Sequence, residues 1–118
     1  MKPDPEFTEA AALRDYVETV ARLLLVEPAA SWSAVGTTST AYIALSQRSP
    51  RHPGRLLMAQ WTDGTGWCLA LEPERGEAPL VLAAWPELGR PEPAVVARRV
   101  LTALGQTTGK TEPDMFPE

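Results

Sequence analysis

The spacing of apolar residues changes twice along this chain of 118 residues, and the change restricts the folds that are open to it. Apolar side chains recur at helical intervals near the N-terminus, at every second position in the middle, and at helical intervals again toward the C-terminus. A helix, a block of short strands and a second helix predict an α+β fold. Short connections between the strands make a mostly antiparallel sheet the expected arrangement.

Two amphipathic helices are predicted. The first spans about residues 8–25, with Thr8 as its N-cap and Phe7 packed against its first turns. The second begins at Pro93, because proline suits the first helical position, and it stops at Gly105. The apolar stripe of the first helix contains Leu13, Tyr16, Val17, Val20 and Leu24, and that of the second contains Val96, Val100, Ala103 and Leu104.

Five strands are predicted between the helices, at residues 31–35, 40–45, 56–61, 67–71 and 80–85. The complete prediction is α-β-β-β-β-β-α, a mostly antiparallel five-stranded sheet with two helices packed on one face. Because every connection is short, we expect each strand to lie beside the next one along the chain.

The third and fourth predicted strands flank Asp63-Gly64, which is a strong signal for a β-hairpin. Pairing about this turn would place Trp61 opposite Trp67. We expect the helices to cover the face that then gathers Leu57, Ala59, Trp61, Trp67, Leu69 and Leu71. A shift of one residue would mix the two faces, and the turn alone does not fix the register.

The opposite face of this hairpin is predicted to carry Leu56, Met58, Gln60, Cys68, Ala70 and Glu72. It is too apolar to face only water, because monomers seldom expose large apolar patches. Two helices that lie together on one face cannot also cover the other. We therefore expect a homodimer, in which a second copy covers this face and Met58 adapts to the partner's shape.

The composition is that of one globular domain, and it narrows the classes of partner. Residues 8–105 are predicted to form the domain, between a flexible segment at residues 1–7 and a flexible tail at residues 106–118. The net charge of −4 and the pI of about 5.0 argue against nucleic acid as a partner. The single cysteine allows no intramolecular disulfide, and neither a signal peptide nor a membrane-spanning run is recognised. These features predict a cytoplasmic protein with no membrane partner.

Several short motifs lie between about Tyr16 and Leu104. They are Ala41-Tyr42-Ile43-Ala44-Leu45, Pro50-Arg51-His52-Pro53, Trp61-Thr62-Asp63 followed by Gly66-Trp67, Ala70-Leu71-Glu72, and Pro93-Ala94-Val95-Val96-Ala97. In these motifs the chain resembles a small actinobacterial family, a domain of unknown function. The resemblance implies an actinobacterial origin, and it implies no activity and no catalytic residues.

Residues with catalytic chemistry are few. His52, the only histidine, has no evident orienting partner, and Cys68 lies within a predicted strand, where we expect it to pack. The segment Gly105–Thr111 is one residue short of a phosphate-binding loop, and it follows a helix instead of a strand. No group of His, Cys, Asp and Glu has the spacing of metal ligands. We predict no enzyme activity, no cofactor and no metal site.

The segment from Gln47 to Arg55 concentrates positive charge within an acidic protein. It contains Arg48, Arg51 and His52 as well as its terminal arginine, and it has no acidic residue. Arginine side chains suit carboxylates, phosphates and acidic protein surfaces. The favoured interpretation is nevertheless a solvated loop between two strands, because isolated surface charges are usually only hydrated.

Three functions are carried forward from the sequence. The favoured hypothesis is a non-catalytic protein-interaction module, either a homodimer or a component of a protein complex, with the candidate contact residues Arg48, Arg51, His52, Arg55, Leu56, Met58, Gln60 and Ala70. One alternative is a small-molecule sensor with a Trp-lined pocket between helix and sheet. Another is a regulator that contacts nucleic acid through the Arg48–Arg55 loop. A pocket with convergent polar groups would favour the sensor, and a flat, symmetric apolar patch would favour the module.

Overall fold

The computed structural model describes residues 5–49, 52–73, 76–86 and 90–108. The elements of this part of the chain are α1 (Pro5–Leu23), a short 3-10 helix η1 (Pro28–Ala30), β1 (Ser31–Ala34), β2 (Thr40–Ser49), β3 (His52–Thr62), β4 (Gly66–Leu71), β5 (Leu80–Trp85) and α2 (Pro93–Thr108). The strands form one sheet in the order β1-β2-β3-β4-β5, and every neighbouring pair is antiparallel. The predicted α+β architecture is confirmed.

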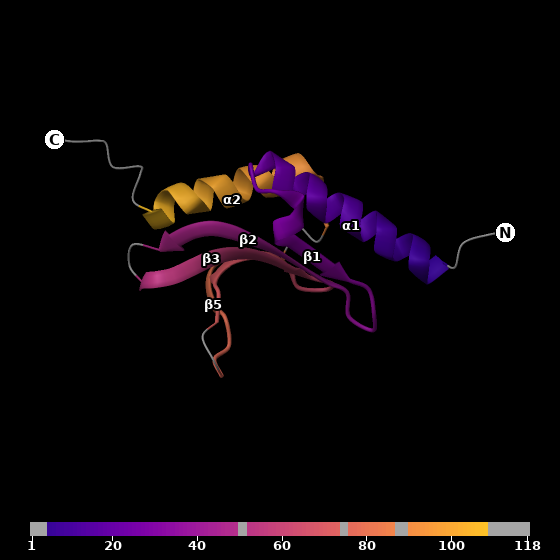
Figure 1. Ribbon diagram of the computed structural model, residues 1–118, viewed down its shortest axis with the longest axis horizontal. Coiled ribbons are helices and arrows are strands. Elements are labelled where there is room, and N and C mark those ends of the chain that lie inside the picture. Colours follow the sequence, from indigo (N-terminus) through magenta and orange to yellow (C-terminus); the bar gives the residue numbers. More distant parts are fainter. Residues whose placement is uncertain (1–4, 50–51, 74–75, 87–89, 109–118) are drawn as a thin grey trace.

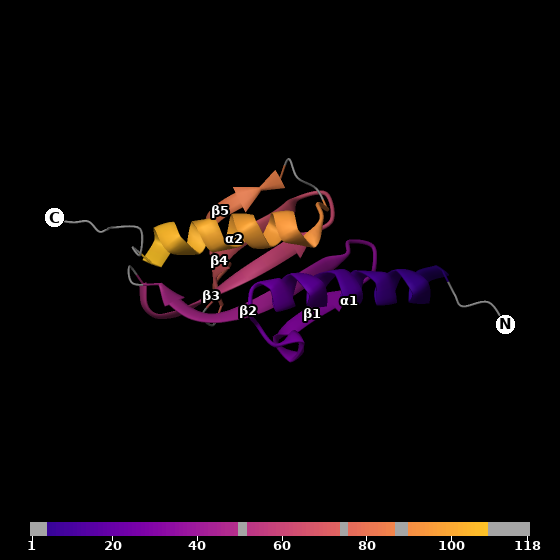
Figure 2. The ribbon, with the colours of Figure 1, turned by 90° about the horizontal axis from the view of Figure 1, so that it is seen from above.

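Both helices lie on the same face of the sheet, as Figure 1 shows. Seen from above in Figure 2, α1 lies over β1 and β2, α2 lies over β4, and the two helices contact each other. They therefore form one continuous layer on the sheet. β5 lies at the margin of the molecule, on the far side of α2 from α1.

The core lies between this helical layer and the sheet, and it uses the predicted hairpin register. Trp61 of β3 pairs with Trp67 of β4, and the pairing continues without interruption to Leu57 and Leu71. The side chains gathered on the helix side are all buried: Leu57, Ala59, Trp61, Trp67, Leu69 and Leu71. The predicted stripes of both helices complete the core, apart from the half-buried Tyr16 at its margin. Each fully buried side chain of this size contributes about 1.5–3 kcal/mol to stability.

The β3–β4 hairpin depends on two glycines with positive φ. Gly64 in the turn and Gly66 after it both have a φ of 87°. A Cβ atom on Gly66 would lie only 2.9 Å from the carbonyl oxygen of Trp85 in β5, whereas a Cβ on Gly64 would meet nothing within 4 Å. Gly66 therefore fixes both the shape of the turn and the close approach of β5.

Three of the four helix ends differ from the prediction. α1 begins at Pro5, so Thr8 lies in its first turn and is not the N-cap; proline suits that start because its missing N–H needs no partner there. α1 also ends two residues earlier than expected, at Leu23. α2 continues through Gly105, which does not take the positive φ that would end a helix. The residues 1–4 and 109–118, which include most of the predicted terminal segments, lie outside the described residues.

β2 and β3 are longer than predicted, and they absorb the basic segment. β2 continues to Ser49 and β3 begins at His52, so only residues 50–51 separate them. The predicted loop over this segment is therefore wrong. The sequence around Pro53 did not indicate that β3 begins there, because proline is depleted from strand interiors. A break in the regular pairing before Arg48 further obscures the alternation of side chains.

Candidate interaction surfaces

The sheet face away from the helices, called the second face below, is partly covered by the chain's own β4–β5 connection. The described parts of this connection pass beneath β3 (Figures 1 and 2). The Arg55 guanidinium of β3 donates hydrogen bonds to the carbonyl oxygen of Glu72 (2.8 Å) and to Glu77 Oε1 (3.3 Å). The Tyr42 hydroxyl of β2 donates to Glu72 Oε2 (2.6 Å). We call these four residues the clasp, because they tie the connection to two strands.

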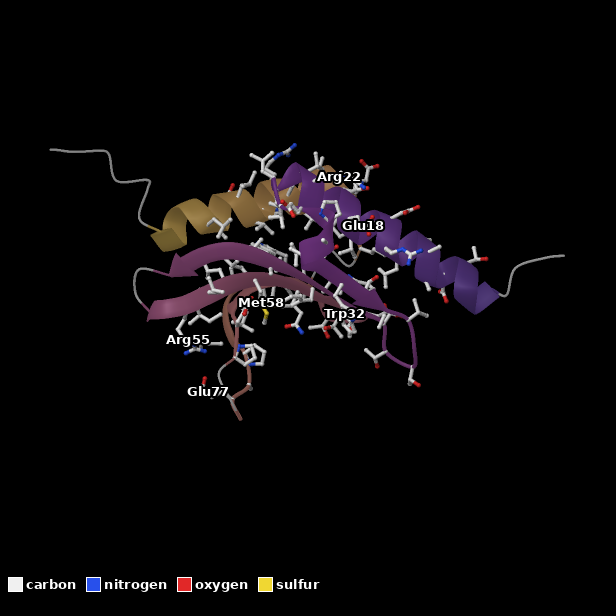
Figure 3. All side chains as sticks on the ribbon, in the orientation of Figure 1. Glu18, Arg22, Trp32, Arg55, Met58 and Glu77 are labelled. Carbon is white, nitrogen blue, oxygen red and sulfur yellow. The ribbon has the colours of Figure 1, made fainter. Side chains whose placement is uncertain are left out.

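Two residues of the surface on which a homodimer was expected are buried within the single chain. Met58 is only 2% exposed and Ala70 is fully buried in the single chain. Figure 3 shows Met58 on the same side of the sheet as Arg55 and Glu77. Leu56 and Gln60 are half-buried. The burial of Met58 and Ala70 within one chain removes the reason for which a second copy was expected on this face. The homodimer itself stays a prediction.

The hydroxyl of Tyr42 in the clasp has a raised pKa. Burial, the hydrogen bond to Glu72 and the negative charge of Glu72 together raise the pKa of Tyr42 to about 12, and burial has the largest effect. A neutral phenol can donate to a carboxylate, whereas a phenolate is repelled by it. The clasp is therefore intact at neutral pH.

The other basic candidates are placed only by their backbone. Arg48 lies opposite Leu56 in the β2–β3 ladder, and His52 begins β3. The side chains of Arg48 and His52, and the whole of Arg51, lie outside the described residues. Arg55 has a side chain that is 18% exposed and pairs with a carboxylate. It therefore stabilises the fold and presents little free charge to a nucleic acid.

Cys68 is the catalytic candidate whose side chain the structure describes. Cys68 is half-buried, and burial raises the pKa of its thiol, with a smaller opposite effect from a backbone hydrogen bond with Gln60. A protonated thiol is a poor nucleophile at neutral pH. Within the described ranges, no three His, Cys, Asp or Glu residues are placed to hold a metal ion. None of the helices described is long and apolar enough to cross a membrane.

β5 is an open edge of the sheet. Among the described strands it pairs only with β4. Its sequence, Leu-Val-Leu-Ala-Ala-Trp, carries no charged side chain, and Leu80 and Val81 are 48% and 52% exposed. Edge strands usually carry charges or prolines that prevent them from pairing with other chains. β5 has neither, so its sequence does not oppose pairing with a further strand.

β1, at the opposite edge, is better protected. It has four residues, two of which are serines, and α1 packs along it. Its one large apolar side chain is Trp32, which is 57% exposed and is labelled in Figure 3. The sequence contained a signal for the difference, because the last strand of a meander lies at an edge and the run at residues 80–85 is uncharged. The contact residues predicted from the sequence do not include those of β5.

A groove of about 410 Å³ lies between β5 and α2. Its walls include Ala83 and Trp85 from β5, and Val95, Arg98, Arg99 and Thr102 from α2. Neither arginine forms an ion pair with a carboxylate of the described residues. The groove is open to solvent and borders the free edge of β5, so a strand that pairs with β5 would also contact it.

The sequence also places the chain among known proteins. Residues 16–102, which run from the middle of α1 into α2 and include all five strands, match the model of a family of unknown function. The chain belongs to the DUF6292 family. No curated protein and no solved structure matches the chain. Membership in DUF6292 confirms the predicted resemblance to an uncharacterised family, and the actinobacterial origin stays a prediction. Both the β5 edge and the clasp lie within the DUF6292 match.

Proposed function

We propose that this DUF6292 protein is a non-catalytic protein-interaction module that associates with a second copy of itself through β5. The observation that carries the proposal is the uncharged edge strand with two half-exposed apolar side chains, Leu80 and Val81. Pairing with another strand would satisfy the outward-facing backbone groups of β5 and remove apolar surface from water. The contact residues proposed from the sequence on the second face are replaced by those of β5.

A two-fold axis suits this edge. Antiparallel pairing of β5 with its copy would use the same surface on both chains, which gives a closed dimer. The two five-stranded sheets would become one sheet of ten strands, ending at β1 on each side. Because β1 is short and packed beside α1, the new sheet would not readily extend further.

Two observations on polar side chains favour a module without catalysis. The Cys68 thiol is held protonated, and Arg55 is engaged in the clasp. We also propose a cytoplasmic location. The single cysteine allows no intramolecular disulfide, and proteins without disulfides are typical of reducing compartments.

The test replaces Val81 by lysine, which puts a charge at the proposed seam. The control is Leu101→Lys, since Leu101 on α2 has nearly the same exposure, 50% against 52%. Sedimentation velocity over a wide range of protein concentration should show a dimer for the unmodified chain and for Leu101→Lys, and a monomer for Val81→Lys. Circular dichroism checks that each variant is folded. A monomeric unmodified chain at every concentration, or a Val81→Lys variant that stays dimeric, would contradict the proposal.

A further inference from the structure

A small pocket opens where the N-terminal half of α1 passes the β3–β4 turn. Its volume is about 120 Å³, which is room for about four water molecules at liquid density. One part of its wall is apolar and comes from Leu13, Val35 and Trp61, and another carries charge from Glu9, Asp63 and Arg90. The backbone N–H of Asp63 donates to the carbonyl oxygen of Ser39 (2.9 Å), which fixes the turn that bears this carboxylate.

Arg90 is held in place by two aromatic rings. Its guanidinium carbon lies over the rings of Tyr16 and Trp61, 5.1 and 5.6 Å from their centres. Aromatic rings attract the faces of a guanidinium, and this leaves its N–H edges available to an oxyanion. No carboxylate in the described part of the chain lies within ion-pair distance of Arg90.

Tyr16 is itself fixed by two hydrogen bonds. Its hydroxyl donates to the carbonyl oxygen of Pro91 (2.5 Å) and accepts from Trp67 Nε1 (3.1 Å). The other ring, Trp61, is only 3% exposed and belongs to the core. The guanidinium therefore rests on a rigid support, which lowers the cost of ordering it when a ligand binds.

The charges that line the pocket decide the class of ligand. A simple anion would be attracted by Arg90 and repelled by Glu9 and Asp63. A simple cation would be attracted by the two carboxylates and repelled by Arg90. A small molecule that carries both charges satisfies all three groups. We propose that the pocket binds a small zwitterion of the α-amino-acid class, with its carboxylate on Arg90, its ammonium toward the two carboxylates and its side chain against Trp61 and Leu13. This site is separate from β5 and does not depend on the dimer.

The first experiment uses the unmodified chain and three probes in isothermal titration calorimetry. The probes are alanine, N-acetylalanine, which lacks the ammonium, and alaninamide, which lacks the carboxylate. Alanine is expected to bind, and each derivative should bind at least about 10-fold more weakly, because each leaves a charged group of the pocket without its partner. The proposal is overturned if alanine does not bind, or if either derivative binds as well as alanine.

The second experiment locates the site with charge-removing variants. Arg90→Gln and Asp63→Asn should each weaken alanine binding at least about 10-fold. The matched controls, Arg98→Gln and Asp15→Asn, remove exposed charges that do not line this pocket and should leave the affinity unchanged. Circular dichroism verifies that each variant is folded. If Arg90→Gln unfolds, Asp63→Asn alone tests the site, because Asp63 is an exposed turn residue. Equal affinity in Asp63→Asn and the unmodified chain would place the ligand elsewhere and overturn the assignment.

Discussion

Leu25 holds a backbone conformation that favours glycine, just after the end of α1. Its φ is 62°, its side chain is 94% exposed, and it is the one non-glycine residue with positive φ among those described. The N–H of Leu25 donates to the carbonyl oxygen of Arg22 (2.9 Å), and the N–H of Val26 donates to that of Ala21 (2.8 Å). This pattern is a Schellman motif, in which the residue at the left-handed position is usually glycine.

We expect Leu25→Gly to stabilise the protein by about 0.5–1 kcal/mol. Glycine removes the strain of the left-handed conformation, and part of this gain is lost to the greater freedom of glycine in the unfolded chain. The same substitution at Leu101, inside α2, should instead destabilise the protein by about 1 kcal/mol, because glycine is a poor helix former. Urea unfolding of both variants measures the two signs. A Leu25→Gly variant that is less stable than the unmodified chain would contradict the account of this helix end.

At the scale of single residues, local chemistry could be predicted and distant contacts could not. Asp63-Gly64 identified the β3–β4 turn because the requirement for positive φ lies within the turn itself. At Gly66 the positive φ is likewise local, but the close approach of the Trp85 carbonyl adds a second need for glycine from a distant strand. The position of Arg90 comes from two rings on other elements. The sequence next to Gly66 and the sequence next to Arg90 do not predict these contacts.

The elements show the same division between local pattern and distant pairing. The helices and the β3–β4 hairpin followed from periodicity, because each buries one continuous face. The clasp joins residues that are as far apart as Tyr42 and Glu72, separated by 30 positions, so the turn chemistry of the β4–β5 connection could not reveal it. Without the clasp, the second face looked more exposed than it is, and the expectation of a homodimer on that face relied on this appearance.

Met58→Glu tests whether the second face is closed in the single chain. Because Met58 is 2% exposed, a carboxylate there would be buried without a partner, and we expect a loss of about 3 kcal/mol or more in unfolding free energy. Gln60→Glu on the same face is the control, and its half-buried side chain should make the loss much smaller. Denaturant unfolding compares the two variants. A Met58→Glu variant as stable as the control would show that Met58 is accessible after all.

Tyr42 makes the clasp sensitive to alkaline pH. Its pKa in the folded chain, about 12, lies above the ordinary value of 10.0, so its contribution to stability is complete below about pH 10 and is lost as pH rises toward 12. We expect the unfolding free energy to fall more steeply over this range in the unmodified chain than in Tyr42→Phe. At neutral pH, Tyr42→Phe should be about 1 kcal/mol less stable, because Glu72 loses a hydrogen bond. Parallel pH profiles for the two proteins would exclude this role for Tyr42.

At the scale of the whole molecule, both helices lie on one face, the clasp covers part of the other, and the remaining difference lies between the two sheet edges. β1 is short and sits beside α1, whereas β5 is uncharged and lies at the margin of the helical layer (Figure 2). The strand order that makes β5 an edge could be predicted from the short connections. Whether the edge of β5 is open to a partner could not be predicted, because this depends on where α2 and the β4–β5 connection lie.

The exchange of backbone amides with deuterium can show which edge a second copy uses. If β5 pairs with its copy, its outward N–H groups become hydrogen-bonded only in the dimer, so their exchange should slow as protein concentration rises. The amides of β1 should exchange at the same rate at every concentration, because that edge stays outside the seam. In Val81→Lys the dependence on concentration should disappear from β5, whereas Leu101→Lys should retain it. Slower exchange in β1 instead of β5 would assign the contact to the other edge, and exchange independent of concentration throughout the sheet would rule out pairing of either edge.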